Sequence, residues 1–322
     1  MIKYLIRRIL ISVPLLLAMT LVTFFLMNMT PGNYFDTLRL NPQISEEVMQ
    51  RYEKLYQLDK PLIQQYFHWL GNLVTRGEWG YSFYYNVPVN KIIGGRLWNT
   101  FVLSLASLLM TWLLAVPLGV WAAVRHNTKM DRVLSFFSFV GLSLPSFFLA
   151  ILLLYAVSVW GGLPLGGMHS AVYDQLTPWG KFIDLLKHLV IPTTVLSFGA
   201  VAGLQRIMRG NMLGVLRQQY ILTARAKGLP EHRVVYRHAL RNAINPMITI
   251  MGYELSGLLS GAAITEIICN WPGLGSLMLT AMRAKDAYLV MASMVMGGVL
   301  LLLGNLIADI LLAASDPRIR YD

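Results

Sequence analysis

The sequence predicts an all-α membrane protein whose chain crosses the bilayer several times. Of the 322 residues, 56% are hydrophobic and only 13% are charged. The chain contains several continuous apolar runs of about 20 residues, the length that an α-helix needs to cross the hydrocarbon core. Transmembrane β-strands are about ten residues long and alternate between polar and apolar positions, which these runs do not do.

Six apolar runs can be read as membrane-spanning helices. Their approximate ranges are 9–29, 97–124, 133–160, 189–205, 247–268 and 288–314. The first run follows basic residues, as in a signal peptide, but it is longer than the usual apolar region and lacks a small-residue cleavage site. We therefore expect it to be a retained helix.

The distribution of lysine and arginine predicts the orientation. With the N-terminus inside, the cytoplasmic segments carry three, three, eight and two basic residues, in chain order. Basic residues collect on the cytoplasmic side, so both termini are expected there. The net charge of +11 is explained by these short loops, which makes nucleic-acid binding an unlikely function.

This orientation divides the chain into parts. Residues 1–30 form the first helix, 31–96 an extracytoplasmic segment, 97–314 a five-helix core, and 315–322 a cytoplasmic tail. Within the core, residues 206–245 form a long cytoplasmic loop. The expected location is the inner membrane of a prokaryote.

The extracytoplasmic segment is expected to hold two helices. Ser45 can cap the first, and the second follows Pro61 and ends near Arg76. Apolar and aromatic side chains lie largely on one side of the second helix: Leu62, Tyr66, Trp69, Leu70 and Leu73. The stripe suits an interfacial anchor, or alternatively a platform for an extracytoplasmic binding protein.

The most informative polar stretch is residues 220–246, called here the basic segment. It should form two helices that meet at a sharp turn, because Gly228 can take a left-handed conformation and Pro230 suits the start of a helix. In the second helix, Arg233, Arg237 and Arg241 share one face, and Val234, Val235 and Leu240 remain for packing. The alternative is a solvated loop that only fixes topology.

The basic segment resembles the coupling segment of permease subunits of ABC importers, in the form found in the dipeptide, oligopeptide and nickel branch. Ala224 and Gly228 stand at the matching positions, whereas the acid that names the family motif is replaced by Leu222 and a later proline by Arg241. The resemblance implies that this segment docks on an ATPase subunit. The residues expected to do so are Ala224, Gly228, Leu229, Pro230, Arg233, Arg237, His238 and Arg241.

Further stretches resemble the same branch in the same order. They are the N-terminal MIKYLIRRILISVPLLL, the glycine-rich GEWGYSF at 77–83, the closing DPRIRY at 316–321, and an outer turn, WPGLG, with Trp271, Pro272, Gly273 and Gly275. Trp271 is expected at the membrane interface. The resemblance implies a type I importer fold, half of a peptide pathway, a second, different permease, two ATPases and a substrate-binding protein. Nickel chelates, glutathione and oligosaccharides are alternative substrates.

Candidate pathway residues come from polar or helix-breaking positions inside the apolar runs. Pro145 and Ser146 mark a kink, and Glu254 lies in the fifth run with Gly257 and Gly261 on its side. A charged side chain there costs about 2.5 to 3.5 kcal/mol, so Glu254 must face protein or water. It can face a pore or be paired inside the bundle.

Catalytic motifs are absent from the sequence. It contains no phosphate-binding G-x-x-x-x-G-K-[ST] loop, no HExxH and no G-x-S-x-G. We therefore expect a non-catalytic chain without metal or cofactor, with ATP and magnesium bound by partner subunits. Two rival classes remain. An ion-coupled carrier would need more spans, usually an inverted repeat, and an ion site, for which only Glu254 could serve. A structural scaffold would not need an organised turn followed by a basic helix face.

Overall fold

The computed structural model describes residues 2–29, 47, 54, 60–248, 250, 251, 254 and 263–315, and these residues are mostly helical. The helix expected to start at Ser45 lies outside them. The chain forms two compact units, one made of Met1–Thr100 with Pro272–Leu300, and the other of Phe101–Trp271 with Leu301–Asp322. We describe each unit separately.

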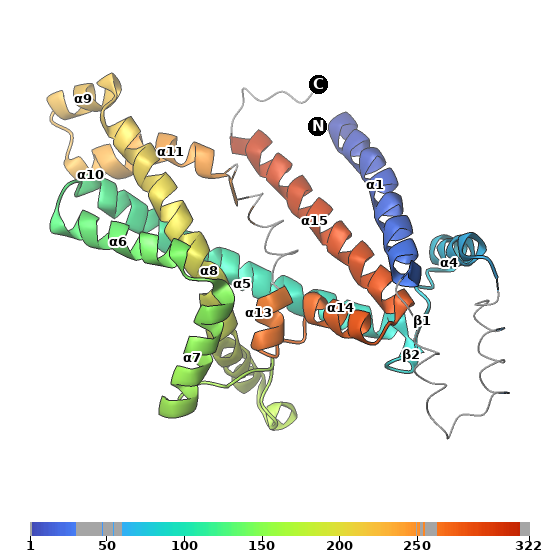
Figure 1. The fold of residues 1–322 in the computed structure, drawn as a ribbon. Coiled ribbons are helices and arrows are strands. Elements are labelled where there is room, and N and C mark those ends of the chain that lie inside the picture. The colour runs from blue at the N-terminus through green and yellow to red at the C-terminus, as the bar shows by residue number, and fades with distance from the viewer. Residues whose placement is uncertain are drawn as a thin grey trace. The chain divides into compact units, whose positions relative to one another are not determined.

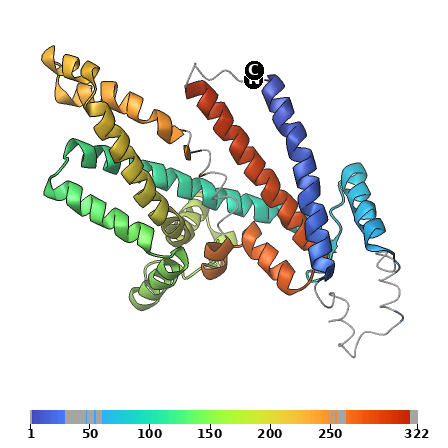
Figure 2. The ribbon, with the colours of Figure 1, turned by 45° about the horizontal axis from the view of Figure 1, so that its top comes forward.

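The first unit is built around α1 (Ile2–Met29), α4 (Leu62–Arg76) and the beginning of α15 (Ala287–Ser315). In both ribbon views, α4 lies beside the C-terminal end of α1 (Figure 1) (Figure 2). Tyr66 and Trp69 of α4 are buried against Phe24 and Met291, with Leu70 and Leu73 packed alongside. The amphipathic helix ending at Arg76 is therefore confirmed, and its apolar stripe packs inside the protein except for Leu62, which is exposed.

A short hairpin follows α4. Its strands, β1 (Tyr81–Ser82) and β2 (Val87–Pro88), pair antiparallel, with Tyr81 opposite Pro88 and Ser82 opposite Val87. Two glycines with positive φ, Gly77 at 65° and Gly80 at 97°, turn the chain from α4 into the hairpin. Helix α5 (Val89–Val124) starts directly after β2, and α14 (Leu274–Arg283) completes this unit.

In the second unit, α5 continues and is followed by α6 (Lys129–Ser143), α7 (Ser146–Trp160) and the long α8 (Pro178–Leu216). A 3₁₀ turn, Tyr173–Gln175, precedes α8. Helices α6 and α8 lie side by side (Figure 1). Their contact is close at Gly141, where an added Cβ would lie 2.8 Å from the Cβ of Ala202.

The remaining elements of the second unit are short. They are α9 (Gln219–Ala226), α10 (Glu231–Arg233), the π-helical turn η2 (Val234–Ala239), α11 (Leu240–Ala243) and α13 (Ala263–Ile268). Helices α9 to α11 belong to the basic segment and lie at the C-terminal end of α8 (Figure 2).

The predicted single helix over 133–160 is wrong. The structure has two helices, α6 and α7, bent by 103° at Leu144 and Pro145. Proline restricts the residue before it to an extended conformation, and Leu144 has φ −82° and ψ 121°. Pro145 also lacks the N–H that would continue the helix, so a sharp break replaces the expected kink.

Within the part of the chain that the structure describes, four helices are long and apolar enough to cross a membrane, or five if the bent α6–α7 pair is one span. They contain the predicted runs 9–29, 97–124, 189–205 and 288–314, and α8 is much longer than its run. The run at 247–268 lies partly outside the described residues. The count of six spans and the orientation therefore stay predictions.

Candidate functional site

The basic segment contains the expected sharp turn. Helix α9 ends at Ala226, and Gly228 has φ 74°, in the left-handed region. Its N–H donates to the Arg225 carbonyl at 2.9 Å, and the Leu229 N–H donates to the Ala224 carbonyl at 3.3 Å. Pro230 then directly precedes α10. These bonds close the end of α9 and redirect the chain within a few residues.

An apolar core joins the basic segment to the ends of α5 and α8. The buried members from the basic segment are Ile221, Ala224, Val234, Val235, Ala239 and Ala243, and they pack with Ala115, Val120, Ala123, Leu204, Met208 and Met212. Helices α5 and α8 approach closely at Gly119, where an added Cβ would lie 2.6 Å from the Cβ of Met208. The basic segment is thus packed onto two long helices and is more than a solvated loop.

The polar side chains of the basic segment face outward. Arg233, Arg237 and Arg241 are exposed, and His238 is half-buried. We predicted a regular helix after Pro230, but the helix contains the π-turn η2, so the side chains between Arg233 and Arg241 do not follow the regular α-helical period. The two consecutive valines, Val234 and Val235, are both buried in this turn.

An ion pair crosses the turn at Gly228. The Arg225 guanidinium donates to both carboxylate oxygens of Glu231, at 3.1 and 2.6 Å. This hydrogen bonding lowers the pKa of Glu231 and raises the pKa of Arg225 from their ordinary values. Both side chains are substantially exposed, so the pair holds the turn only weakly.

A second ion pair, between residues far apart in the sequence, joins α6 to α8. Asp131 is buried, and Arg209 donates to its two oxygens from Nε at 2.6 Å and from a terminal nitrogen at 2.8 Å. The Asn127 N–H and the His126 ring also contact this carboxylate. Asp131 and Arg209 are 78 residues apart, so only the folded chain reveals the pair.

A buried carboxylate also organises the hairpin of the first unit. Asp286 accepts hydrogen bonds from the Ser82 hydroxyl at 2.7 Å and from the backbone N–H groups of Tyr84 and Leu289. Burial raises the pKa of Asp286, while these hydrogen bonds act in the opposite direction. Its position directly before an apolar run is typical of a helix cap, but the sequence does not indicate its contact with Ser82.

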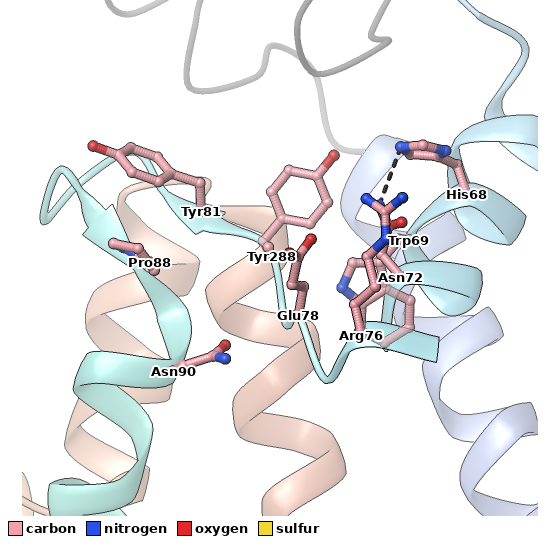
Figure 3. Close-up of a pocket in the computed structure, with 10 residues that line it drawn as sticks. His68, Trp69, Asn72, Arg76, Glu78, Tyr81, Pro88, Asn90 and Tyr288 are labelled. Atoms are coloured by element: carbon pink, nitrogen blue, oxygen red, sulfur yellow. Dashed lines mark hydrogen bonds between the residues drawn. The ribbon is translucent and has the colours of Figure 1, made fainter. Parts of the chain in front are cut away.

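A pocket of about 540 Å³ opens between α4, the hairpin and the start of α15 (Figure 3). We call it the α4 pocket. Its aromatic lining comes from Trp69, Tyr81 and Tyr288. Its other lining residues are His68, Asn72, Arg76, Glu78, Gly80, Pro88 and Asn90. Sequence reasoning identified the stripe on α4 and the glycine-rich turn, but not that they enclose a cavity.

The pathway candidates are only partly described. Pro145 and Ser146 are exposed at the break between α6 and α7. Glu254 is half-buried, and its Oε2 atom has no hydrogen-bond partner among the residues that the structure describes. Gly257 and Gly261 lie outside the described residues. Nothing described here brings Glu254 together with Pro145.

The turn at 271–275 differs from expectation in one respect. Trp271 is 1% exposed and packs with Leu103 and Leu189, so it belongs to a core of the second unit and not to an exposed interface. In the first unit, the Pro272 carbonyl accepts from the Asn99 amide at 2.8 Å. Gly273 caps α14, and Gly275 lies in its first turn.

Long apolar helices and a structured basic segment packed onto two of them are the features of a polytopic membrane protein. The chain belongs to the family of inner membrane components of binding-protein-dependent transport systems. Residues 115–321 match the model of that family, and residues 1–106 match the model of its N-terminal part.

Named relatives match along the full chain. The chain is 41% identical to the oligopeptide transport system permease protein AppB of Bacillus subtilis, over 100% of both chains. It is 35% identical to the oligopeptide permease OppB of Haemophilus influenzae, over 100% of both. It is 33% identical to the dipeptide permease DppB of Escherichia coli K12, over 100% of this chain and 99% of the relative.

A solved structure supports the fold. The chain resembles a chain of the MetNI methionine ABC transporter in an inward-facing conformation, with a TM-score of 0.53 and 17% identity. The similarity covers 70% of this chain and 96% of the other. The expected all-α permease fold of an ABC importer and the location in the inner membrane are thereby confirmed.

Proposed function

We propose that this chain is one of two permease subunits of an ATP-driven importer of small peptides. Full-length similarity to oligopeptide and dipeptide permeases is the observation that carries this proposal. In this assignment the chain forms half of the pathway and is not an enzyme. A second, different permease, two ATPases and an extracytoplasmic binding protein complete the importer, and ATP and magnesium bind to the ATPases.

The basic segment is proposed to carry movement from the ATPases to the helices. It lies on the cytoplasmic side in this proposal, with Arg233, Arg237 and Arg241 facing the ATPase. Its apolar core includes the ends of α5 and α8, so a push on the segment moves both helices together as one body. The buried Asp131–Arg209 pair extends that body to α6. Alternating access would follow from this rigid-body motion.

Peptide is the substrate class that the named relatives favour. Importers of nickel chelates, glutathione or oligosaccharides on the same scaffold are the alternatives. An ion-coupled carrier centred on Glu254 is the rival of a different class. It is supported by the Oε2 atom of Glu254, which has no hydrogen-bond partner among the described residues. The two classes differ in one respect that can be measured, because only an ABC permease binds ATPase subunits.

A pull-down tests this proposal. The tagged chain is purified in mild detergent and every co-purifying chain is identified, for the native sequence and for a variant with Arg233, Arg237 and Arg241 changed to glutamate. We expect two ATPases and a second permease with the native chain, and loss of the ATPases with the variant. Changing the exposed Arg132, which lies outside the basic segment, to glutamate is the matched control. Failure to capture any ATPase, even by crosslinking, would contradict the proposal.

A further inference from the structure

The walls of the α4 pocket are fixed by hydrogen bonds. The Trp69 indole N–H donates to the Trp79 carbonyl at 3.0 Å. Asn90 donates to the Gly77 carbonyl at 2.9 Å and accepts from the Trp79 N–H at 3.2 Å. These bonds hold the 77–80 turn between α4 and the start of α5, so the groups that line the cavity are held in place without a ligand.

Close packing fixes the remaining wall. Gly80 has φ 97°, and an added Cβ would lie 2.8 Å from the ring of Tyr288. The hairpin therefore rests directly on the start of α15, where Asp286 also holds Ser82. Such preorganised aromatic walls are typical of small-molecule sites, and about 540 Å³ lies within their usual range of roughly 300 to 1,000 Å³.

Two opposite charges line the same cavity. Arg76 is the last residue of α4, and Glu78 follows it across the left-handed Gly77. Figure 3 shows Arg76 on the wall formed by α4, with Glu78 next to Tyr288. Among the described residues, neither charged side chain makes an ion pair or a side-chain hydrogen bond. Both charges thus remain available to a ligand.

A cavity lined by an arginine and a glutamate, neither paired among the described residues, and by aromatic walls favours a ligand that carries both charges around an apolar part. We propose that the α4 pocket binds a short peptide as a zwitterion, with Arg76 taking its carboxylate and Glu78 its ammonium group. Trp69, Tyr81 and Tyr288 would then contact its side chains. This inference rests on the proposed function, and it adds a subsite at which the permease itself recognises the two ends of the peptide.

The test measures binding of the dipeptide Ala-Phe to the complete importer without its binding protein, in phosphatidylcholine nanodiscs. We expect Arg76→Gln and Glu78→Gln each to weaken binding about tenfold or more, because each removes a charge-assisted contact. Both residues are exposed, so the variants should fold normally. Lys91→Gln, an exposed cation of the same unit outside the pocket, should bind like the native chain.

Peptides with one end blocked show which residue binds which end of the peptide. Ala-Phe amide should bind the native chain and Arg76→Gln equally, and N-acetyl-Ala-Phe should bind the native chain and Glu78→Gln equally. The inference is overturned if Ala-Phe does not bind, or if Arg76→Gln and Glu78→Gln bind it as tightly as the native chain does. The inference is also overturned if the variants have an effect only when the nanodiscs contain phosphatidylethanolamine, whose headgroup has a primary ammonium group like that of a peptide. It is overturned as well if the variants change only the association of the binding protein.

ATP-driven uptake separates this inference from the proposed function. If Ala-Phe is imported by the reconstituted system at native rates but never binds the α4 pocket, the inference fails and the proposed function stands. If no peptide is imported under any condition while another solute is, the proposed function fails.

Discussion

The basic segment and the hairpin are both small elements held against long helices, but different interactions hold them. The basic segment is held by a core of buried aliphatic side chains. The hairpin depends on one buried carboxylate, Asp286, which accepts hydrogen bonds from the Ser82 hydroxyl and from several backbone N–H groups. Apolar packing is non-directional and tolerates small adjustments, whereas an unmatched buried polar group costs its full desolvation. The hairpin should therefore be the more sensitive of the two to a single substitution.

Removing the carboxylate of Asp286 should have the largest effect. Asp286→Ala leaves the Ser82 hydroxyl and the backbone N–H groups around it without their acceptor, and we expect a loss of stability on the order of 3 to 5 kcal/mol. Hydrogen exchange of residues 77–88 and the midpoint of thermal unfolding in detergent measure it. Asp174→Ala, at an exposed carboxylate, is the control. Equal destabilisation by Asp286→Ala and Asp174→Ala would contradict the greater sensitivity of the hairpin.

Overpacking the contact beneath the basic segment should have a smaller effect. Gly119→Ala places a methyl group 2.6 Å from the Cβ of Met208, and we expect about 1 to 3 kcal/mol of destabilisation. Gly214→Ala in α8 meets no atom within 4 Å and should be neutral or slightly stabilising. The same unfolding midpoint reports both. Equal midpoints for the two variants would mean that α5 and α8 adjust freely at this contact.

The turn at Gly228 isolates backbone strain from packing. An added Cβ meets no atom within 4 Å, but φ is 74°, so Gly228→Val should cost about 1 to 2 kcal/mol through the backbone alone. We expect the variant to insert in the membrane and to lose peptide transport, because valine resists the left-handed conformation that the turn needs. Gly228→Asn, a residue that tolerates this conformation, should retain transport. Native transport by Gly228→Val would rule out the coupling role of this turn.

The smallest effect is expected at the exposed pair of Arg225 and Glu231. The pKa of Glu231 is lowered in the folded chain, so its contribution is present above the pKa of the unfolded chain and is lost as the pH falls through the folded value. Solvent screening limits it to a few tenths of a kcal/mol. The difference in unfolding midpoint between native chain and Glu231→Gln should shrink as the pH falls below about 4.5, the ordinary value, and salt should reduce it. A difference in unfolding midpoint that grows as the pH falls would contradict this prediction.

Local features of both regions could be predicted from the sequence. The turn at Gly228 follows from the conformational freedom of glycine, and the buried face of α4 follows from the spacing of Tyr66 and Trp69. Burial of Val234 and Val235 also matches the prediction. Each of these inferences needs only neighbouring residues and helical periodicity.

Features that depend on distant partners could not be predicted. The Asp131–Arg209 pair joins residues far apart in the chain, and the α4 pocket needs α15 to supply Tyr288. Trp271 was expected at an interface because tryptophan is common there, but a core encloses it. The sequence predicts a kink at Pro145, but the structure has a full break there. Proline can either kink a helix or end it, and only the folded chain shows that the backbone of Leu144 is extended and ends α6.

The bond between Ser82 and Asp286 also bears on how the chain is made. These residues are 204 positions apart, so at about 5 to 20 residues per second the ribosome needs roughly 10 to 40 s to supply the acceptor after the donor. During that interval the hairpin has no carboxylate to close it. Completion of the first unit must therefore wait for the start of the last long helix, and a nascent chain stalled before Asp286 would hold the Ser82 hydroxyl without this acceptor.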